Sequence, residues 1–465
     1  MSTVTTSPVT TSPVAHPVAH PAGATSLRER LDLGREQALR AAAPLRLGRV
    51  SETVGLHLRV VGLRGAVGDL LEVRPADRAP VLVEVAASST EGLVCLPLGR
   101  TAGIEVGAPV HHTGGPLRVR VGDALRGRVL DGLGRPVDGG PVLETLPGLA
   151  LVDVDHAAPD ALSRPRIDRQ LGLGVRALDT LVPCGLGQRL GIMAGSGVGK
   201  SSLLSMIARG TDAEVSVIAL IGERGREVRE FIENDLGPEG LARSVVVVAT
   251  SDAPPVERLR AAFVATRIAE SFREAGRHVV LMMDSLTRVA MAQREIGLSA
   301  GEPPATRGYP PSVFALLPRL LERAGTAPGG SITGLYTVLV EGDDLQDPIG
   351  DTARSILDGH VVLTRRLATA GHFPSIDVLE SISRTTGAVT GPAQRADAVA
   401  LRRMLAAHRD VRELVEIGAY VAGTDPDADA ALARMPRIEA FLRQDMEDST
   451  PLPEAWSRLQ ELVAP

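Results

Sequence analysis

A glycine-rich turn between an apolar strand and a helix constrains the fold of this chain more than any other feature. Residues 189–193 are largely apolar, residues 194–199 read Ala-Gly-Ser-Gly-Val-Gly, and Lys200 opens a stretch with helical periodicity. Lys200 is the only lysine among 50 Lys and Arg residues. Its compact ammonium on a flexible stem reaches phosphates inside a tight backbone loop, where the wide guanidinium of arginine does not fit. The pattern predicts a P-loop and a parallel α/β sheet.

In a P-loop, backbone N–H groups of small residues face the phosphates, and the helix N-terminus adds a favourable dipole. We expect Lys200 to contact the β- and γ-phosphates of ATP and Ser201 to hold Mg²⁺. Alanine stands at position 194, where the strict pattern has its first glycine, and alanine tolerates most turn conformations. The predicted ATP-binding residues of the turn are Ala194, Gly195, Ser196, Gly197, Val198, Gly199, Lys200, Ser201 and Ser202.

Two carboxylates follow other apolar runs. Asp284 ends the run 278–283, at the edge where open α/β sheets bind ligands, and is predicted to help hold Mg²⁺. Glu223 follows the run 215–221 and is predicted to orient the water that attacks the γ-phosphate. Arg224 is a candidate contact for the charge on that phosphate. On spacing alone, residues 222–227 favour a solvated, charge-rich turn over a catalytic loop.

The rest of the chain divides by composition. Residues 1–26 are low in complexity and dense in proline, which predicts a disordered tail, and residues 27–44 contain a short helix suited to docking another protein. Short β-branched runs punctuated by glycine and proline predict a β-barrel over 45–115. Residues 126–136 are rich in glycine and read as a turn-rich bridge out of the barrel. Strands and helices alternate over 116–389, which predicts a parallel sheet covered on both faces. Residues 390–465 are predicted to be helical, with helices over 396–407, 411–422, 428–433 and 437–444.

Bulk composition argues against several classes of protein. A formal net charge of −6 and 2% aromatic residues disfavour nucleic acid as the main partner, because phosphates need a basic face and single-stranded bases need stacking platforms. Cys95 and Cys184 have no metal-ligand spacing, so we expect reduced thiols. No apolar run approaches the length of about 18 residues needed to span a bilayer, and the first residues lack a secretory pattern. The protein is predicted to be cytoplasmic.

Over residues 45–445 these motifs resemble the catalytic subunits of rotary ATPases. Residues 222–226 resemble the catalytic-glutamate loop of that family. Pro-Ser-Ile-Asp-Val-Leu-Glu-Ser-Ile-Ser at 374–383 fits its signature decapeptide, and Arg384 follows directly. Segments 281–297 and 301–314 are similar to the type III export ATPases, and Met282-Met283 with residues 286–291 resemble the flagellar branch of that group.

The resemblance implies an N-terminal β-barrel, a RecA-like P-loop core and a C-terminal helical domain, assembled as a homohexamer. It implies that the active sites lie between subunits, with Arg384 reaching into the neighbouring site as an arginine finger. Phe373 matches the aromatic residue that stacks on adenine. The implied catalytic residues are Lys200, Glu223, Arg224 and Arg384.

The implied function is ATP hydrolysis that energises protein export by the flagellar type III apparatus, at the inner face of the cell membrane. The implied partners are a stator or regulator protein at the N-terminal helix, a central stalk protein, export-gate components, and export substrates or chaperones. Four alternatives remain open: the injectisome ATPase, the catalytic subunit of an F-type ATP synthase, a ring nucleic-acid translocase, and a non-catalytic ring subunit. The last would be expected to lack Glu223.

Overall fold

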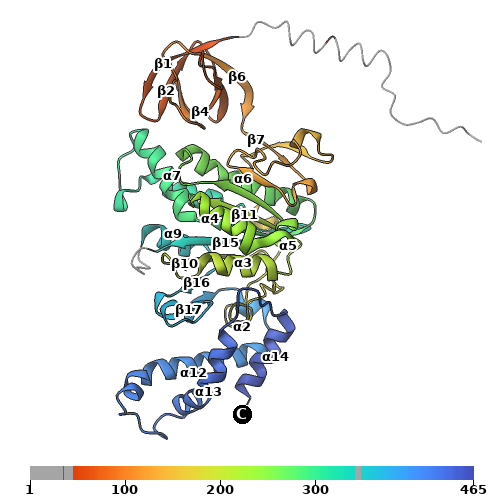
Figure 1. Ribbon diagram of the computed structural model, residues 1–465, viewed down its shortest axis with the longest axis vertical. Helices are drawn as coiled ribbons and strands as arrows, with labels where there is room; N and C mark the ends of the chain where they lie inside the picture. The colour runs from red at the N-terminus through yellow and green to blue at the C-terminus, as the bar shows by residue number, and fades with distance from the viewer. Residues whose placement is uncertain (1–34, 36–45, 341–346, 465) are drawn as a thin grey trace, which may run out of the picture. The chain divides into compact units, whose positions relative to one another are not determined.

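The computed structural model describes residue 35 and residues 46–340 and 347–464 (Figure 1). The chain divides into two units, Met1–Arg46 and Leu47–Pro465. The predicted disordered tail 1–26 and docking helix 27–44 lie outside the described residues, apart from Arg35. All helices and strands from Gly48 onward belong to the second unit.

The N-terminal part of this unit is a closed β-barrel, which confirms the prediction. Its strand order is β1-β2-β5-β4-β3-β6. Alternate residues face inward: Leu58 and Val60 of β2, for example, are almost fully buried, as a strand period of two requires. The strands are β1 (Gly48–Val54), β2 (His57–Val61), β3 (Asp69–Val73), β4 (Val81–Ser89), β5 (Gly92–Pro97) and β6 (Pro109–Pro116). The first and last of these strands were not predicted from the sequence.

The central part is built on a nine-stranded sheet with the order β17-β16-β10-β15-β13-β11-β12-β8, to which β14 adds beside β15. The strands from β16 to β8 are parallel, whereas β17 is antiparallel to β16 and β14 to β15. The strands are β8 (Val129–Asp131), β10 (Arg189–Ala194), β11 (Val215–Ile221), β12 (Ser244–Ala249), β13 (His278–Asp284), β14 (Gly325–Ala327), β15 (Gly330–Leu339), β16 (Gly359–Leu363) and β17 (Ile376–Ser383). β7 (Arg118–Val121) and β9 (Ala150–Asp153) form a separate pair.

Helices cover both faces of this sheet, as the apolar strands predict. Val217 and Ala219 of β11 pack into one core, with α6, α7 and α8, while Ile218 and Leu220 pack into another, with α2 and α3. These helices are α2 (Arg176–Leu181), α3 (Lys200–Gly210), α6 (Pro255–Glu274), α7 (Leu286–Ser299) and α8 (Pro311–Leu321). The other α-helices described in this part are α4 (Gly225–Glu230), α5 (Gly237–Ala242), α9 (Pro348–Ile356), α10 (Arg365–Thr369) and α11 (Thr386–Val389).

The C-terminal part is helical, as predicted, but its helices are longer than the sequence indicates. They are α12 (Pro392–Glu416), α13 (Pro426–Leu442) and α14 (Leu452–Val463). We expected breaks at 408–410 and 434–436. The first is only a polar stretch inside α12, and Pro436 lies inside α13, where Ile438 and Phe441 anchor the helix in the core. Packing of these apolar residues outweighs the local cost of the proline.

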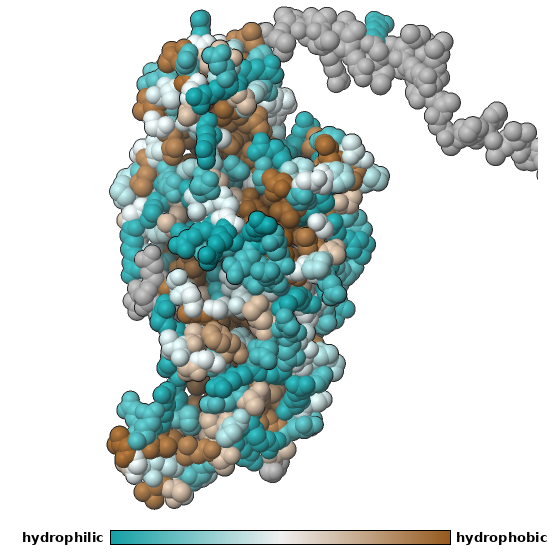
Figure 2. Space-filling model, viewed as in Figure 1, coloured by the Kyte–Doolittle hydropathy of each residue, from teal (hydrophilic) through white to brown (hydrophobic). Residues whose placement is uncertain are grey.

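Apolar side chains remain exposed near the end of α12 and in the turn that follows. Ile417 is 75% exposed and Val421 69% exposed. Figure 2 shows the corresponding brown surface where α12 and α13 lie in Figure 1. No helix among the described residues has the length and apolar character that would let it cross a membrane.

Candidate active site

Lys200, Glu223 and Asp284, three of the predicted site residues, gather where three parallel strands end. β10 leads into the P-loop, and Asp284 is the last residue of β13. Asp284 pairs with Leu220 of β11, so Glu223 projects three residues beyond that level. Open α/β sheets bind ligands at this edge. Lys200 and Asp284 therefore meet although 84 residues separate them in the chain.

The P-loop backbone requires its glycines. Gly197 and Gly199 have φ angles of 73° and 92°, in the left-handed region that side chains with a Cβ avoid. A Cβ at Gly197 would meet no atom within 4 Å, and one at Gly199 would meet only the Phe373 ring, at 3.4 Å. Small residues thus leave the loop open at both positions, which in a P-loop lets backbone N–H groups face the phosphates.

Two side chains from later segments hold this loop in place. Ser375 Oγ donates a hydrogen bond to the Val198 carbonyl at 2.5 Å, and Arg365 Nη2 donates to the Ser196 carbonyl at 3.1 Å. The backbone of Phe373 is held in turn, because the Gln444 N–H donates to its carbonyl at 2.9 Å. Segments just before and within the signature decapeptide therefore support the P-loop directly.

The Lys200 ammonium lies between two carboxylates. Its Nζ is 2.5 Å from Asp284 Oδ1 and 3.2 Å from Glu223 Oε1. The three side chains are 11%, 4% and 18% exposed, respectively. Such shielding from water strengthens each attraction and makes an unpaired charge costly.

The pKa values of Lys200 and Glu223 reflect this arrangement. Burial alone would lower the pKa of Lys200, but the charges of Asp284 and Glu223 outweigh it and raise the pKa above its ordinary value. Burial raises the pKa of Glu223, Lys200 opposes the rise, and the nearby Asp284 charge adds to it. Lys200 is therefore a full cation near neutral pH, and Glu223 is a more basic carboxylate than usual.

Thr337 is a site residue that sequence reasoning missed. Its Oγ1 donates to Asp284 Oδ1 at 2.8 Å and lies 3.3 Å from the Met283 carbonyl oxygen. Met283 pairs with Tyr336 across β13 and β15, so Thr337 lies level with Asp284. Only the order of strands in the sheet reveals this neighbour, because the two residues are far apart in the chain.

Arg288 is a second residue that was missed. It lies in the first turn of α7, four residues after Asp284, and its aliphatic stem packs beside Gly222, where a Cβ would approach Arg288 Cγ to 2.8 Å. Gly222 has a φ of 73° and directly precedes Glu223. The sequence offers one signal for Arg288. It comes four residues after Asp284, and this spacing places the side chain of a residue in the first helical turn near the end of the strand.

The chemistry of the donors fits Mg²⁺. Asp284 supplies a buried carboxylate, and Ser201 supplies an exposed hydroxyl in the first turn of α3. Carboxylate and hydroxyl oxygens, completed by waters and phosphate oxygens, are what this hard cation prefers. Ser202 lies in the same first turn, half-buried.

Two predicted catalytic arginines are not part of the Lys200 cluster in the described structure. Arg224 is 81% exposed, and its Nη1 pairs with Glu227 Oε1 at 3.2 Å. Arg384 directly follows Ser383, which pairs with Gly359 at the start of β16. The P-loop lies at the other end of β16, where Leu363 pairs with Ala194. At about 3.3 Å per residue, these levels are about 13 Å apart. Arg384 therefore lies at the amino end of the parallel strands, whereas the P-loop of its own chain lies at their carboxyl end.

Comparison with known proteins identifies the family. Residues 174–383 match the "ATP synthase alpha/beta family, nucleotide-binding domain", and residues 390–461 match the "T3SS EscN ATPase C-terminal domain". The flagellum-specific ATP synthase of Bacillus subtilis (strain 168) is 48% identical over 421 residues, 90% of this chain and 95% of the relative. The type 3 secretion system ATPase of Xanthomonas euvesicatoria is 50% identical over 400 residues, 86% of this chain and 90% of the relative. The chain belongs to the type III secretion and flagellum-specific ATPase family.

Solved structures of this ATPase family have the same fold. The assembled ATPase EscN of enteropathogenic E. coli superposes with a TM-score of 0.85 at 45% identity, covering 90% of this chain and 100% of EscN. EscN in complex with its central stalk EscO gives a TM-score of 0.83 at 44% identity, with the same coverage. The β-barrel, nucleotide-binding core and helical C-terminal domain are therefore those of the family.

Proposed function

We propose that this protein hydrolyses ATP to ADP and phosphate and thereby energises protein export by a type III secretion apparatus, most specifically the flagellar one. The observation that carries the proposal is the Lys200 ammonium placed between Glu223 and Asp284 at the open end of a glycine cradle. A phosphate-binding cation, a carboxylate for the attacking water and a carboxylate for a metal are the parts that phosphoryl transfer to water needs.

Each residue has a distinct role in this proposal. The P-loop N–H groups and Lys200 bind the β- and γ-phosphates and stabilise charge that develops on the γ-phosphoryl oxygens. Glu223 orients the attacking water through its carboxylate and accepts a proton from it. Ser201 and Asp284 would hold Mg²⁺, which supplies further neutralisation of phosphate charge. Phe373 is 45% exposed and its ring lies beside Gly199 of the P-loop. Adenine can stack on the face of this ring.

Arg384 acts in trans in this proposal. Its place at the far edge of the sheet supports this role, because a side chain there cannot contribute to the site of its own chain. An arginine finger of this kind raises turnover by about 10³–10⁵-fold in other phosphoryl-transfer enzymes. Arg224, exposed just after Glu223, would complete the same site once a neighbouring subunit covers it.

We infer a homohexameric ring with a central stalk protein among its partners. Relatives solved as an assembled ATPase and as a complex with a central stalk support this inference. The exposed apolar end of α12 is a candidate surface for such contacts. We also propose further partners: a stator or regulator at the N-terminal helix, export-gate components and export substrates. The protein would act at the inner face of the cell membrane.

The flagellar and injectisome versions of this function differ in partners rather than in chemistry. Relatives with both names match at 48–50% identity. The motif around Met282 and Met283 favours the flagellar version. Purification of the intact protein from its own cells separates them: co-purification of flagellar export components is expected, and injectisome components would reverse the assignment.

Substitution of Glu223 by glutamine tests the chemistry. The amide keeps the size of the side chain but is a poor base, so we expect turnover to fall by about 10²–10⁴-fold while ATP still binds. Glu230→Gln makes the same change on the exposed surface of α4 and should leave turnover near that of the wild type. Wild-type turnover in Glu223→Gln would remove Glu223 from the mechanism.

A further inference from the structure

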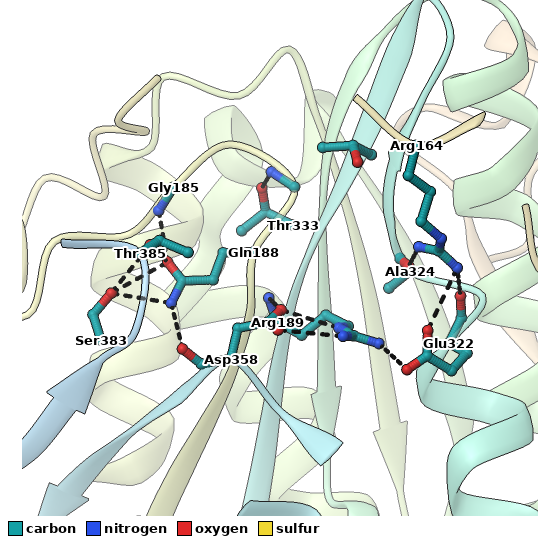
Figure 3. Close-up of polar contacts among 12 residues, drawn as sticks. Arg164, Gly185, Gln188, Arg189, Glu322, Ala324, Thr333, Asp358, Ser383 and Thr385 are labelled. Carbon is teal, nitrogen blue, oxygen red and sulfur yellow. Dashed lines mark hydrogen bonds and ion pairs between the residues drawn. The ribbon is translucent and has the colours of Figure 1, made fainter. Parts of the chain in front are cut away.

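A buried glutamine lies at the other end of the P-loop strand. Gln188 directly precedes β10 and is completely buried, and both polar atoms of its amide are engaged (Figure 3). Its Oε1 accepts hydrogen bonds from the Gly185 N–H at 2.7 Å and from Thr385 Oγ1 at 2.6 Å. Its Nε2 donates to the Asp358 carbonyl at 2.9 Å and to Ser383 Oγ at 3.0 Å.

These partners determine which way the amide points. The Gly185 N–H can only donate, and the Asp358 carbonyl can only accept, so exchanging Oε1 and Nε2 would oppose like groups at both contacts. A fully satisfied buried network of this kind is rigid, because each of its bonds would be expensive to leave unmade. Gln188 therefore fixes the groups that it contacts.

The groups that Gln188 contacts surround Arg384. Ser383 and Thr385 are its neighbours on either side, and both are bonded to the Gln188 amide. The backbone N–H of Arg384 donates to the Asp358 carbonyl at 3.0 Å, the same carbonyl that accepts from Gln188 Nε2. One side chain thus holds residues 383 and 385 directly and residue 384 through a shared acceptor.

Asp358 is itself held by the first residue of β10. Its carboxylate accepts from the Arg189 backbone N–H at 3.0 Å and from Arg189 Nε and Nη2 at 3.1 and 3.2 Å. Arg189 Nη1 also pairs with Glu322 Oε1 at 2.6 Å. Figure 3 shows these contacts as one continuous network from Ser383 to Glu322. The residues that hold Arg384, namely Ser383, Thr385 and Asp358, are thereby linked to β10, the strand that leads into the P-loop.

We propose that Gln188 is a positioning residue for catalysis in trans: it sets Arg384 in the orientation that the neighbouring subunit's active site requires. The inference rests on the proposed role of Arg384 as an arginine finger. A purely structural role for Gln188 would hold the edge strand β17 in place and would affect only the chain that carries the substitution. The positioning role predicts loss of hydrolysis at the neighbouring subunit's active site, whereas the structural role predicts a loss confined to the substituted subunit.

Steady-state kinetics give the first test. Gln188→Ala removes all four amide contacts, and Thr385→Val removes one hydroxyl donor while keeping the shape of the side chain. Because a misplacement of about 1 Å can cost about 10²-fold in rate, we expect kcat to fall about 10–100-fold. KM should change less than about 2-fold, since the P-loop of the same chain is untouched. Thr385→Ser retains the hydroxyl and should restore kcat.

Mixed rings give the decisive test. Gln188→Ala subunits keep an intact P-loop but misplace Arg384, whereas Lys200→Ala subunits keep Arg384 but lose their own site. Single-turnover hydrolysis, with ATP below the concentration of sites, reports each interface alone. In an equal mixture, about half of the Gln188→Ala sites face a Lys200→Ala neighbour, so about half of the bound ATP should be hydrolysed near the wild-type rate. Thr385→Val replaces Gln188→Ala if that variant does not fold.

An Arg384→Ala plus Lys200→Ala mixture separates the two proposals. Recovery of fast hydrolysis in both mixtures supports both. Recovery with Arg384→Ala but not with Gln188→Ala or Thr385→Val overturns the role of Gln188 and leaves the arginine finger intact. No recovery in either mixture refutes the action of Arg384 in trans, and the role of Gln188 falls with it.

Discussion

Removal of the Lys200 ammonium should destabilise the folded protein in a manner that depends on pH. Lys200→Met keeps the unbranched stem and leaves Glu223 and Asp284 facing each other without a cation. Breaking a buried ion pair by removing one partner costs about 3–5 kcal/mol. Because Glu223 remains 18% exposed and can take up a proton, we expect about 3 kcal/mol at pH 8, the lower end of that range.

The sign of the pH dependence follows from the Glu223 carboxyl. Its pKa in the folded protein is above the ordinary 4.5, so its ionisation as pH rises lowers the free energy of unfolding. Lys200 lowers that pKa, and its removal therefore enlarges the loss. The difference between variant and wild type should shrink as pH falls toward 4.5, by up to about 1.4 kcal/mol per pH unit while Glu223 protonates.

The single tryptophan provides the assay. Trp456 is buried, its Nε1 donates to Gln170 Oε1 at 3.2 Å, and it belongs to the same core as Val198 of the P-loop. Urea unfolding followed by its fluorescence, without nucleotide or Mg²⁺, at pH 5 to 8 gives the difference in stability. Arg224→Met changes the net charge equally at an exposed pair and should cost about 0.5 kcal/mol or less. A loss for Lys200→Met that is constant with pH, or larger at pH 5, would show that protonation of Glu223 does not relieve the missing charge.

Two further predictions concern assembly and nucleotide recognition. ATPase activity per subunit should rise cooperatively with protein concentration, because a lone subunit lacks Arg384 from a neighbour; activity that stays flat on dilution would count against shared sites. Phe373→Ala should raise KM for ATP about 5-fold or more, since stacking of a base on an aromatic ring contributes about 1–3 kcal/mol. Phe373→Tyr keeps the ring and should leave KM nearly unchanged; a wild-type KM for the alanine variant would mean that adenine binds elsewhere.

The sequence predicts the parts of the site that a local motif encodes. The P-loop, Asp284 and Glu223 each follow an apolar strand directly, so the chain order alone places them at the carboxyl edge of a parallel sheet. Thr337 and Gln188 escaped prediction for the opposite reason. Their partners are fixed by strand order and register, which bring together residues 53 positions apart in one case and 197 in the other.

The fold shows the same division between local and non-local information. Continuous apolar runs predicted the central parallel strands, whereas β8 looked like part of a turn-rich bridge and β17 like a motif without a secondary structure. Both are short or polar strands at the edges of the sheet, where half of the surface is not buried and the apolar signal is weak. Pro436 misled the helix boundaries because local propensity yields to packing.

The reversed direction of β17 has a consequence for the assembly. Because this edge strand runs against its neighbour, it places Arg384 at the amino end of the parallel strands, opposite the P-loop of its own chain. In the proposed mechanism, each copy therefore offers half of two separate sites. In an open row of copies, the active site at one end receives no Arg384, and the Arg384 at the other end reaches no active site. Every open row therefore contains one incomplete active site. Closure into a circle is the arrangement in which no half is left over.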